Sequence, residues 1–112
     1  MNYDMFFNEL DSAITVCDRD GKILFMNERA FKTFEKYGGR DLLGKNIFDY
    51  HNPDSCDIIR KLLKEDRSNT YTITKNNRQK LIHQTTWHKD GKVMGLIEFS
   101  VELPEDMPNH QR

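Results

Sequence analysis

Hydrophobic and polar residues alternate along two stretches near the start of the chain, which is the pattern of half-buried β-strands. The stretches cover residues 12–18 and 22–27. The segment DRDG at 18–21 lies between them and is a hairpin signal, because Gly readily adopts the positive φ that closes such a loop. The pattern therefore predicts a first antiparallel pair of strands.

Three more strands are expected in the second half of the chain, at residues 70–74, 79–88 and 93–103. They are rich in Thr, Ile, Val and aromatic residues, which fit a pleated surface. The pair Asn76-Asn77 tolerates a left-handed backbone in the first connection, and Asp90-Gly91 repeats the hairpin signal in the second. We therefore expect these strands to follow one another in antiparallel order.

Short helices are predicted between the two groups of strands and before the first. Hydrophobic residues fall at helical spacing over 4–10, and again over 28–36 after Asn27, a natural N-cap. One further turn is expected over 40–43, stopped by Gly44.

The longest helix is predicted to begin with Asn52 as N-cap and Pro53 at the first helical position. Hydrophobic residues then recur on one side, with charged residues on the other. The predicted buried stripe is Ile58, Ile59, Leu62 and Leu63.

This order of elements predicts an α+β domain. Hairpin connections favour a five-stranded antiparallel sheet, with the short helices and the one longer helix packed on one face. We expect an N-terminal cap segment over residues 1–10 and the folded domain over 11–103. Residues 104–112, with two prolines, are expected to be a flexible tail or the start of a linker.

Charge and cysteine content narrow the range of partners. The chain has 112 residues and a net charge of -1, so it lacks the basic face that binding to nucleic-acid phosphates needs. No hydrophobic run approaches the roughly 20 residues that span a bilayer, and no secretion signal opens the chain. Cys17 and Cys56 are isolated and indicate reduced, buried thiols. We expect a cytoplasmic domain that binds neither nucleic acid nor membrane.

Five short motifs occur in a fixed order along nearly the whole chain. They are AITV at 13–16, DRDG at 18–21, ILFMN at 23–27 followed by Ala30-Phe31, LLGKNIF at 42–48, and Trp87 with DGKVMG at 90–95. Together they resemble the PAS domain family. The segment YHNPDS at 50–55 also resembles a bacterial and archaeal subgroup with a Cys-His-Pro-Pro motif, of which Tyr50 and Asn52 replace the first and third residues.

The resemblance implies a sensory, regulatory module of signal transduction rather than an enzyme. Family members have a pocket between the sheet and the helices that is empty or holds haem, flavin or a small metabolite. The resemblance therefore does not specify which cofactor, if any, this chain binds. Their signals usually leave through the sheet surface and the terminal helices. The resemblance therefore implies a homodimer, an output domain or signalling partner, and a small molecule or protein bound in or on the pocket.

His51 is the sharpest candidate for that pocket. Its imidazole would ligate haem iron or bind a ligand, or else order the loop by bonding a backbone carbonyl. His83 shares a strand face with Trp87, and that face looks either into the pocket or outward. No metal site is predicted, because two histidines would need a third ligand, for which Glu98 and Cys56 are the only suggestions. The candidate pocket residues are His51, Phe31, Phe34, Phe48, Tyr50, Ile59, His83 and Trp87.

Two alternatives to a plain sensor stay open. The first is a haem- or redox-sensing domain that uses His51. The second is a small α+β enzyme in which Asp49 and His51 transfer a proton. No nucleophile elbow, phosphate loop or metal-spaced cluster accompanies that pair, so the chain is predicted not to be an enzyme.

Overall fold

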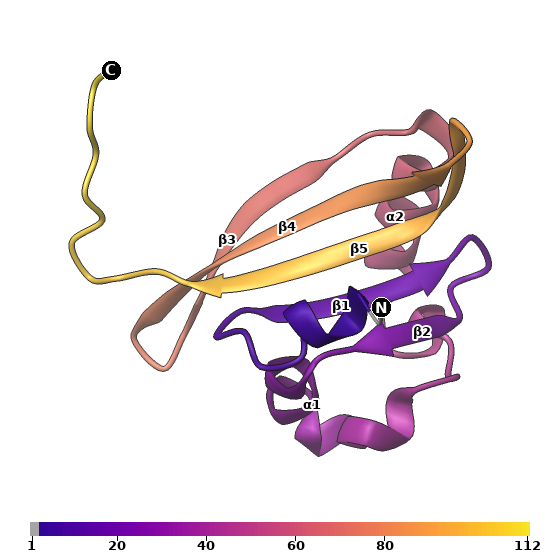
Figure 1. Cartoon of the computed structure of the whole chain (residues 1–112), viewed down its shortest axis with the longest axis horizontal. Coiled ribbons are helices and arrows are strands. Elements are labelled where there is room, and N and C mark those ends of the chain that lie inside the picture. The colour runs from indigo at the N-terminus through magenta and orange to yellow at the C-terminus, as the bar shows by residue number, and fades with distance from the viewer. Residues whose placement is uncertain (1–2) are drawn as a thin grey trace.

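Five antiparallel strands form one sheet, in the order β2-β1-β5-β4-β3, in the computed structural model, which describes residues 3–112 (Figure 1). The N-terminal hairpin joins the three later strands where β1 pairs with β5. The predicted boundaries of all five strands are confirmed to within one residue. The strands are β1 Ala13–Asp18, β2 Ile23–Met26, β3 Asn69–Lys75, β4 Arg78–Lys89 and β5 Lys92–Glu102.

Helical segments fill the connections, which confirms the predicted α+β class. Most of them are short 3-10 helices, labelled η, and only α2 is long. The segments are η1 Tyr3–Phe6, α1 Glu28–Thr33, η2 Glu35–Tyr37, η3 Gly39–Leu42, η4 Ile47–Asp49 and α2 Pro53–Glu65.

Two predicted helices are longer than the structure shows. The first was expected over 4–10 but is only the 3-10 turn η1, because so short a segment cannot sustain an α-helix alone. Residues 1 and 2 of the predicted cap segment lie outside the described residues. The second ends at Thr33 rather than at Lys36. The Thr33 hydroxyl donates to the Arg29 carbonyl oxygen at 2.8 Å, a side-chain bond that bends and weakens helices.

The predicted start of α2 is confirmed, and one residue of its buried stripe is wrong. Asn52 caps the helix and Pro53 is its first residue. Ile58 is 49% exposed, whereas Cys56 is buried in its place. With 3.6 residues per turn, Ile58 lies about 100° round the helix from the buried Ile59 and so misses the sheet.

Asn27 holds three parts of the chain together from the interior. Its side-chain oxygen accepts hydrogen bonds from the backbone N–H groups of Ala30, at the start of α1, and Ile14, in β1, at 3.1 and 3.0 Å. Its side-chain nitrogen donates to the carbonyl oxygens of Phe7 and Ser12, both at 2.8 Å. The residue is fully buried, so these bonds are shielded from water. The placement of α1 and the N-terminal segment against β1 depends on this amide.

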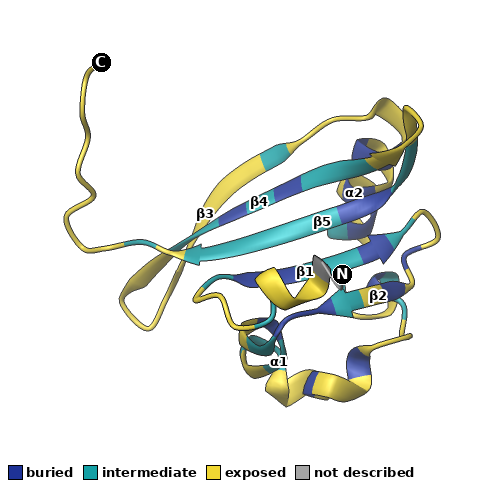
Figure 2. Ribbon diagram, in the orientation of Figure 1, coloured by how far each residue is buried: buried dark blue, intermediate teal, exposed yellow. Residues whose placement is uncertain are grey.

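β3 is almost wholly exposed, whereas β1, β2, β4 and β5 each carry buried residues (Figure 2). The sheet also has two distinct faces. The inner face packs against the helices, and cross-strand partners such as Cys17 and Leu96 belong to the hydrophobic core there. The opposite face, which we call the outer face, carries apolar side chains that are only partly buried. Its cross-strand pairs include Val16 with Ile97 and Leu81 with Val101.

Residues 104–112 contain no helix or strand and are exposed. They extend away from the end of β5 (Figure 1). Their role as a tail or linker stays a prediction.

Asn27→Ala is expected to lower the free energy of unfolding by about 3 kcal/mol or more. Loss of the N-cap costs about 1 kcal/mol, and each buried backbone group left unpaired costs about 1–3 kcal/mol. Urea unfolding followed by circular dichroism measures the change. Asn52→Ala is the matched control, because it removes the same side chain from an exposed cap with one hydrogen bond, for about 1 kcal/mol. Equal losses in the two variants would contradict the role given to Asn27.

Candidate functional site

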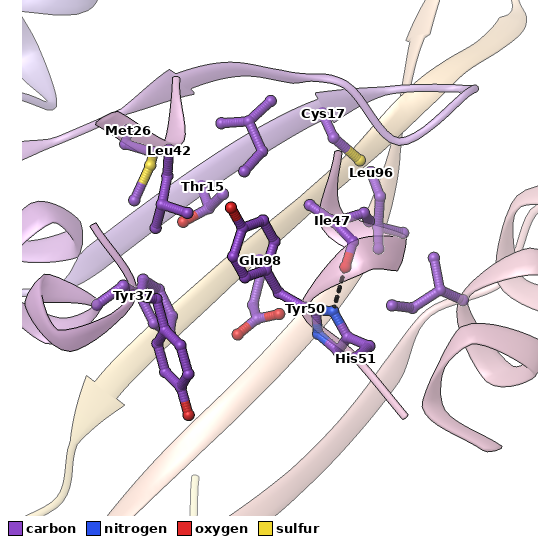
Figure 3. A pocket seen from close by; sticks show the side chains of 13 residues that line it. Thr15, Cys17, Met26, Tyr37, Leu42, Ile47, Tyr50, His51, Leu96 and Glu98 are labelled. Atoms are coloured by element: carbon purple, nitrogen blue, oxygen red, sulfur yellow. Dashed lines mark hydrogen bonds between the residues drawn. The ribbon is translucent and has the colours of Figure 1, made fainter. Parts of the chain in front are cut away.

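A cavity of about 230 Å³ lies between the inner face of the sheet and the helical segments (Figure 3). Strands β1, β2 and β5 form its floor, the segments from η2 to just beyond η4 form its wall, and α2 closes one side. Most of the lining is apolar. The lining residues are Thr15, Cys17, Ile23, Met26, Phe34, Tyr37, Leu42, Ile47, Tyr50, His51, Ile59, Leu96 and Glu98.

The wall of the cavity is attached to the β1–β2 hairpin through the backbone. The N–H of Ile23 donates to the carbonyl of Lys45, and the N–H of Ile47 donates to the carbonyl of Gly21, both at 2.8 Å. Gly21 has a φ of +91°, and a Cβ there would lie 2.7 Å from the Phe48 ring. Glycine at this turn therefore lets η4 approach the hairpin closely and places the residues after η4 over the sheet.

A row of polar side chains crosses the inner face of the sheet and ends in the cavity. The Asn69 side-chain nitrogen donates to the Gln84 side-chain oxygen at 3.2 Å, and the Gln84 nitrogen donates to the Glu98 carboxylate at 3.3 Å. Gln84 is 4% exposed, so these bonds lie inside the core. This polar row, in cross-strand order from β3 to β1, consists of Asn69, Gln84, Glu98 and Thr15.

Burial raises the pKa of Glu98 above its usual 4.5, although the hydrogen bond from Gln84 and the charge of His51 lower it. The net rise shows that lost hydration outweighs both partners. A carboxylate offers about four acceptor sites, whereas Gln84 is the only hydrogen-bond donor to Glu98 among the described residues. Glu98 therefore has unused acceptor capacity in the cavity.

His51 lines the cavity with its Nδ1 already bonded to the backbone. Its Nδ1 lies 2.7 Å from the Ile47 carbonyl oxygen, and because a carbonyl only accepts, Nδ1 carries the proton. In the neutral ring, Nε2 is then an acceptor. Figure 3 shows this second nitrogen on the side of the Glu98 carboxylate. The backbone bond expected as the structural role of His51 is present, and contact with a ligand stays a prediction.

Two tyrosines and a cysteine complete the polar lining. Tyr37 and Tyr50 are about half exposed and pack edge to face, with ring centroids 6.5 Å apart, so they border the opening of the cavity. Burial raises the pKa of Cys17 to about 11, partly opposed by a backbone hydrogen bond from Leu96. The Cys17 thiol is therefore protonated at neutral pH and is not a nucleophile.

Half of the residues predicted for the pocket line the cavity. Phe31 and Phe48 do not line it, and each ring instead lies beneath an arginine guanidinium. The Arg40 guanidinium lies 4.5 Å from the centroid of the Phe31 ring. The Arg60 guanidinium lies 4.4 Å from that of Phe48. The predicted residues that do line the cavity are Phe34, Tyr50, His51 and Ile59.

His83 and Trp87 lie on the outer face, so that strand face looks outward and not into the cavity. The His83 ring stacks on Phe99 with centroids 6.3 Å apart. The Trp87 indole N–H donates to the Cys17 carbonyl at 2.9 Å. It crosses β5 at Gly95, where a Cβ would lie 2.6 Å from the indole nitrogen.

Glu98 and Gln84 are the residues that the sequence analysis undervalued. Glu98 was suggested only as a metal ligand, and Gln84 was not singled out. Each occupies a core-facing position of an alternating strand, beside Leu96 and Ile82 respectively. A polar residue at such a position needs a partner, which is the signal that indicates them, but the partner is identified only by the strand register.

The described residues contain no group of three His, Cys, Asp or Glu side chains that could hold a metal ion. His51 Nδ1 bonds Ile47 and not Asp49, which is exposed, so the proposed proton-transfer pair lacks its hydrogen bond. No helix within residues 3–112 is long and apolar enough to cross a membrane.

Comparisons with known proteins identify the family of this fold. The family model described as "PAS fold" matches residues 7–106. The Aer2 receptor of Vibrio cholerae, described as a dual PAS-heme oxygen sensor, is similar with a TM-score of 0.65 and 15% identity over 83% of this chain and 95% of that chain. A PAS domain from Colwellia psychrerythraea has a TM-score of 0.66 and 14% identity over 88% and 92%.

Two further matches cover only part of the other protein. VqmA bound to DPO has a TM-score of 0.66 and 16% identity over 90% of this chain and 56% of that chain. VqmA of Vibrio cholerae is also described as a dimer in the absence of its target DNA. The basic helix-loop-helix ARNT-like protein 1 of Pongo abelii is 45% identical over 47 residues, which are 42% of this chain and 7% of that protein. The family match is to the PAS fold as a whole, and the Cys-His-Pro-Pro subgroup stays a prediction.

Glu98→Gln is expected to raise the thermal midpoint at neutral pH and to lose this effect in acid. The raised pKa means that folding takes up a proton at pH values between 4.5 and the folded-state pKa, so stability falls as pH rises through that window. Gln stays neutral and still offers an oxygen to Gln84. Calorimetry at about pH 7.5 and pH 4 measures the difference.

The matched control is Glu102→Gln on the same strand. Glu102 is exposed and paired with Arg78, and this partner lowers its pKa. Its ionised form is therefore stabilising, so the variant is expected to lower the midpoint at neutral pH. A fall in the midpoint of Glu98→Gln at neutral pH would contradict the burial argument.

Proposed function

The chain belongs to the PAS-fold family, whose members are sensory modules of signal-transduction proteins, and we propose that it senses a small molecule bound in the cavity. PAS domains are typically regulatory rather than catalytic. The observation that carries the proposal is the apolar cavity with Glu98 and His51 in its lining. Sites for small molecules combine an apolar lining with a few placed polar groups.

The structural relatives support the proposal that a ligand is bound, but they do not indicate which ligand this chain binds. Aer2 is described as a dual PAS-heme oxygen sensor, and VqmA is described as bound to DPO. These relatives are associated with ligands of different chemistry, so the ligand of this chain has to be inferred from the lining of its own cavity.

Haem fits the lining of this cavity poorly. His51 has the arrangement of a metal-binding histidine, with one nitrogen bonded to a carbonyl and the other available. The cavity, at about 230 Å³, is nevertheless smaller than the roughly 300–1,000 Å³ that drug-sized ligands need, and haem is larger than those. The lining also contains no Lys or Arg that could pair with the haem propionates. We therefore favour a smaller ligand over the haem- or redox-sensing alternative.

A route from the cavity to the outer face runs through β5. Glu98 faces the cavity, whereas its neighbours Ile97 and Phe99 project from the opposite face, because side chains alternate along a strand. A ligand that pulls on Glu98 would shift β5 and thereby the outer face. This face is the surface from which a signal would pass on.

We further propose that the outer face binds a second copy of the chain. The face is apolar but only partly buried, and the N-terminal segment adds exposed large side chains, including Phe6 at 57% and Leu10 at 41%. A homodimer would cover both surfaces and act on an output domain or a signalling partner. The net charge of -1 gives no support to direct contact with nucleic acid.

A small-molecule screen by ¹H–¹⁵N NMR is expected to give compounds whose shifts concentrate around the cavity, at Ile47, His51, Leu96 and Glu98. Leu42→Phe places a larger side chain in the cavity. It should weaken the affinity of these compounds about tenfold or more, equivalent to about 1.4 kcal/mol. Leu43→Phe is the control, because Leu43 is exposed and does not line the cavity. If no compound shifts these residues, and native mass spectrometry finds no bound molecule, the proposal fails.

Val101→Glu is expected to shift the chain from dimer to monomer in sedimentation equilibrium, because it buries a charge at the proposed contact. Ile73→Glu is the control. Ile73 is 37% exposed on β3, and its pairing with Lys80 places it on the inner side of the sheet. A wild-type chain that is monomeric at all concentrations, or equal dimerisation of both variants, would refute the contact.

A further inference from the structure

The Glu98 carboxylate has no lysine or arginine partner in the cavity. Among the lining residues, all of which the structure describes, none is Lys or Arg, and Glu98 is the only acid. The ammonium group of Lys36 lies 5.0 Å from the centroid of the Tyr37 ring, but Lys36 does not line the cavity. A carboxylate withdrawn from water without a cation or several donors is costly, so the cavity is incomplete as a recognition site.

The His51 ring, when neutral, adds a second acceptor to the cavity. The polar row donates toward Glu98, since Gln84 uses its nitrogen for that bond and its oxygen for Asn69. His51 uses its proton on Ile47, so its Nε2 accepts. Figure 3 shows Nε2 on the side of the Glu98 carboxylate. Two acceptors in the lining of one cavity are complementary to a group with several N–H donors and poorly suited to an anion.

The rest of the lining suits a cation with a hydrocarbon body. Phe34 and Tyr50 contribute aromatic rings, whose faces attract cations. Ile59 and Leu96 contribute apolar surface. The volume of about 230 Å³ restricts the body to a small one, such as a single ring with a short substituent.

We propose that the cavity binds a small apolar amine or amidine, whose N–H groups donate to the Glu98 carboxylate and to His51 Nε2. This inference rests on the proposed function, because it names the ligand class of the same cavity. The competing arrangement is a closed pair in which protonated Glu98 donates to Nε2 and no ligand is needed.

Four one-ring probes separate these readings: benzylamine, benzamidine, benzyl alcohol and benzoate. Titrated into the full chain at about pH 7.5 and followed by NMR shifts of the cavity residues, benzylamine and benzamidine are expected to bind at least about tenfold more tightly than benzyl alcohol. Benzoate is expected to bind more weakly still. Binding of the two cations should weaken as pH falls and Glu98 takes up its proton.

Glu98→Gln should remove most of the preference for the cations while keeping the bond from Gln84. Glu102→Gln is the matched control, because it changes the net charge equally on the same strand but lies outside the cavity, paired with Arg78. It is expected to leave the preference unchanged.

Each outcome decides the inference. Equal or tighter binding of benzyl alcohol or benzoate overturns it and leaves the proposed function standing. Cation binding that Glu98→Gln does not weaken also overturns it, because the probes then bind elsewhere. If none of the four probes shifts the cavity residues, the closed pair is favoured and the inference fails. The proposed function fails as well only if the wider screen and native mass spectrometry also find no ligand.

Discussion

Four hydrogen bonds to the side chain of Asn27 determine how the helical half of the molecule sits on the sheet. Asn27 itself is fully buried, and together the four bonds join the N-terminal segment, β1 and α1. The wall of the cavity follows α1 in the chain and is attached a second time, through Ile47 and Gly21, to the β1–β2 hairpin. These two attachments hold the short helices above the inner face and keep them from packing directly onto it, which leaves the cavity between them.

The polar row includes an acid, Glu98, at a position where an apolar side chain would make the fold more stable. The raised pKa of Glu98 shows that its burial is only partly compensated. Residues that lower stability in this way are common at functional sites, where the missing partner is supplied by a ligand. The same strand carries apolar residues to the outer face, so the ligand site and the proposed dimer contact share β5.

The sequence was sufficient for the strands, their hairpins and the caps, because these depend on local patterns such as Asp90-Gly91 and Asn52-Pro53. It misjudged Ile58 and the end of α1, where packing and the Thr33 side chain override periodicity. It placed His51 at the site but could not pair Glu98 with Gln84. That pairing depends on the register between β4 and β5, and the residues near each of them in sequence do not determine this register. For the same reason the orientation of His83 and Trp87 stayed open.

The central claim is that Glu98 is the recognition group of a ligand cavity. A crystal structure of the chain soaked with benzylamine tests it most directly. We expect the ammonium nitrogen to lie within hydrogen-bond distance of the Glu98 carboxylate and His51 Nε2, with the ring among Phe34, Ile59 and Leu96. An empty cavity with Glu98 bonded to His51, or an amine bound only at the outer face, would contradict it.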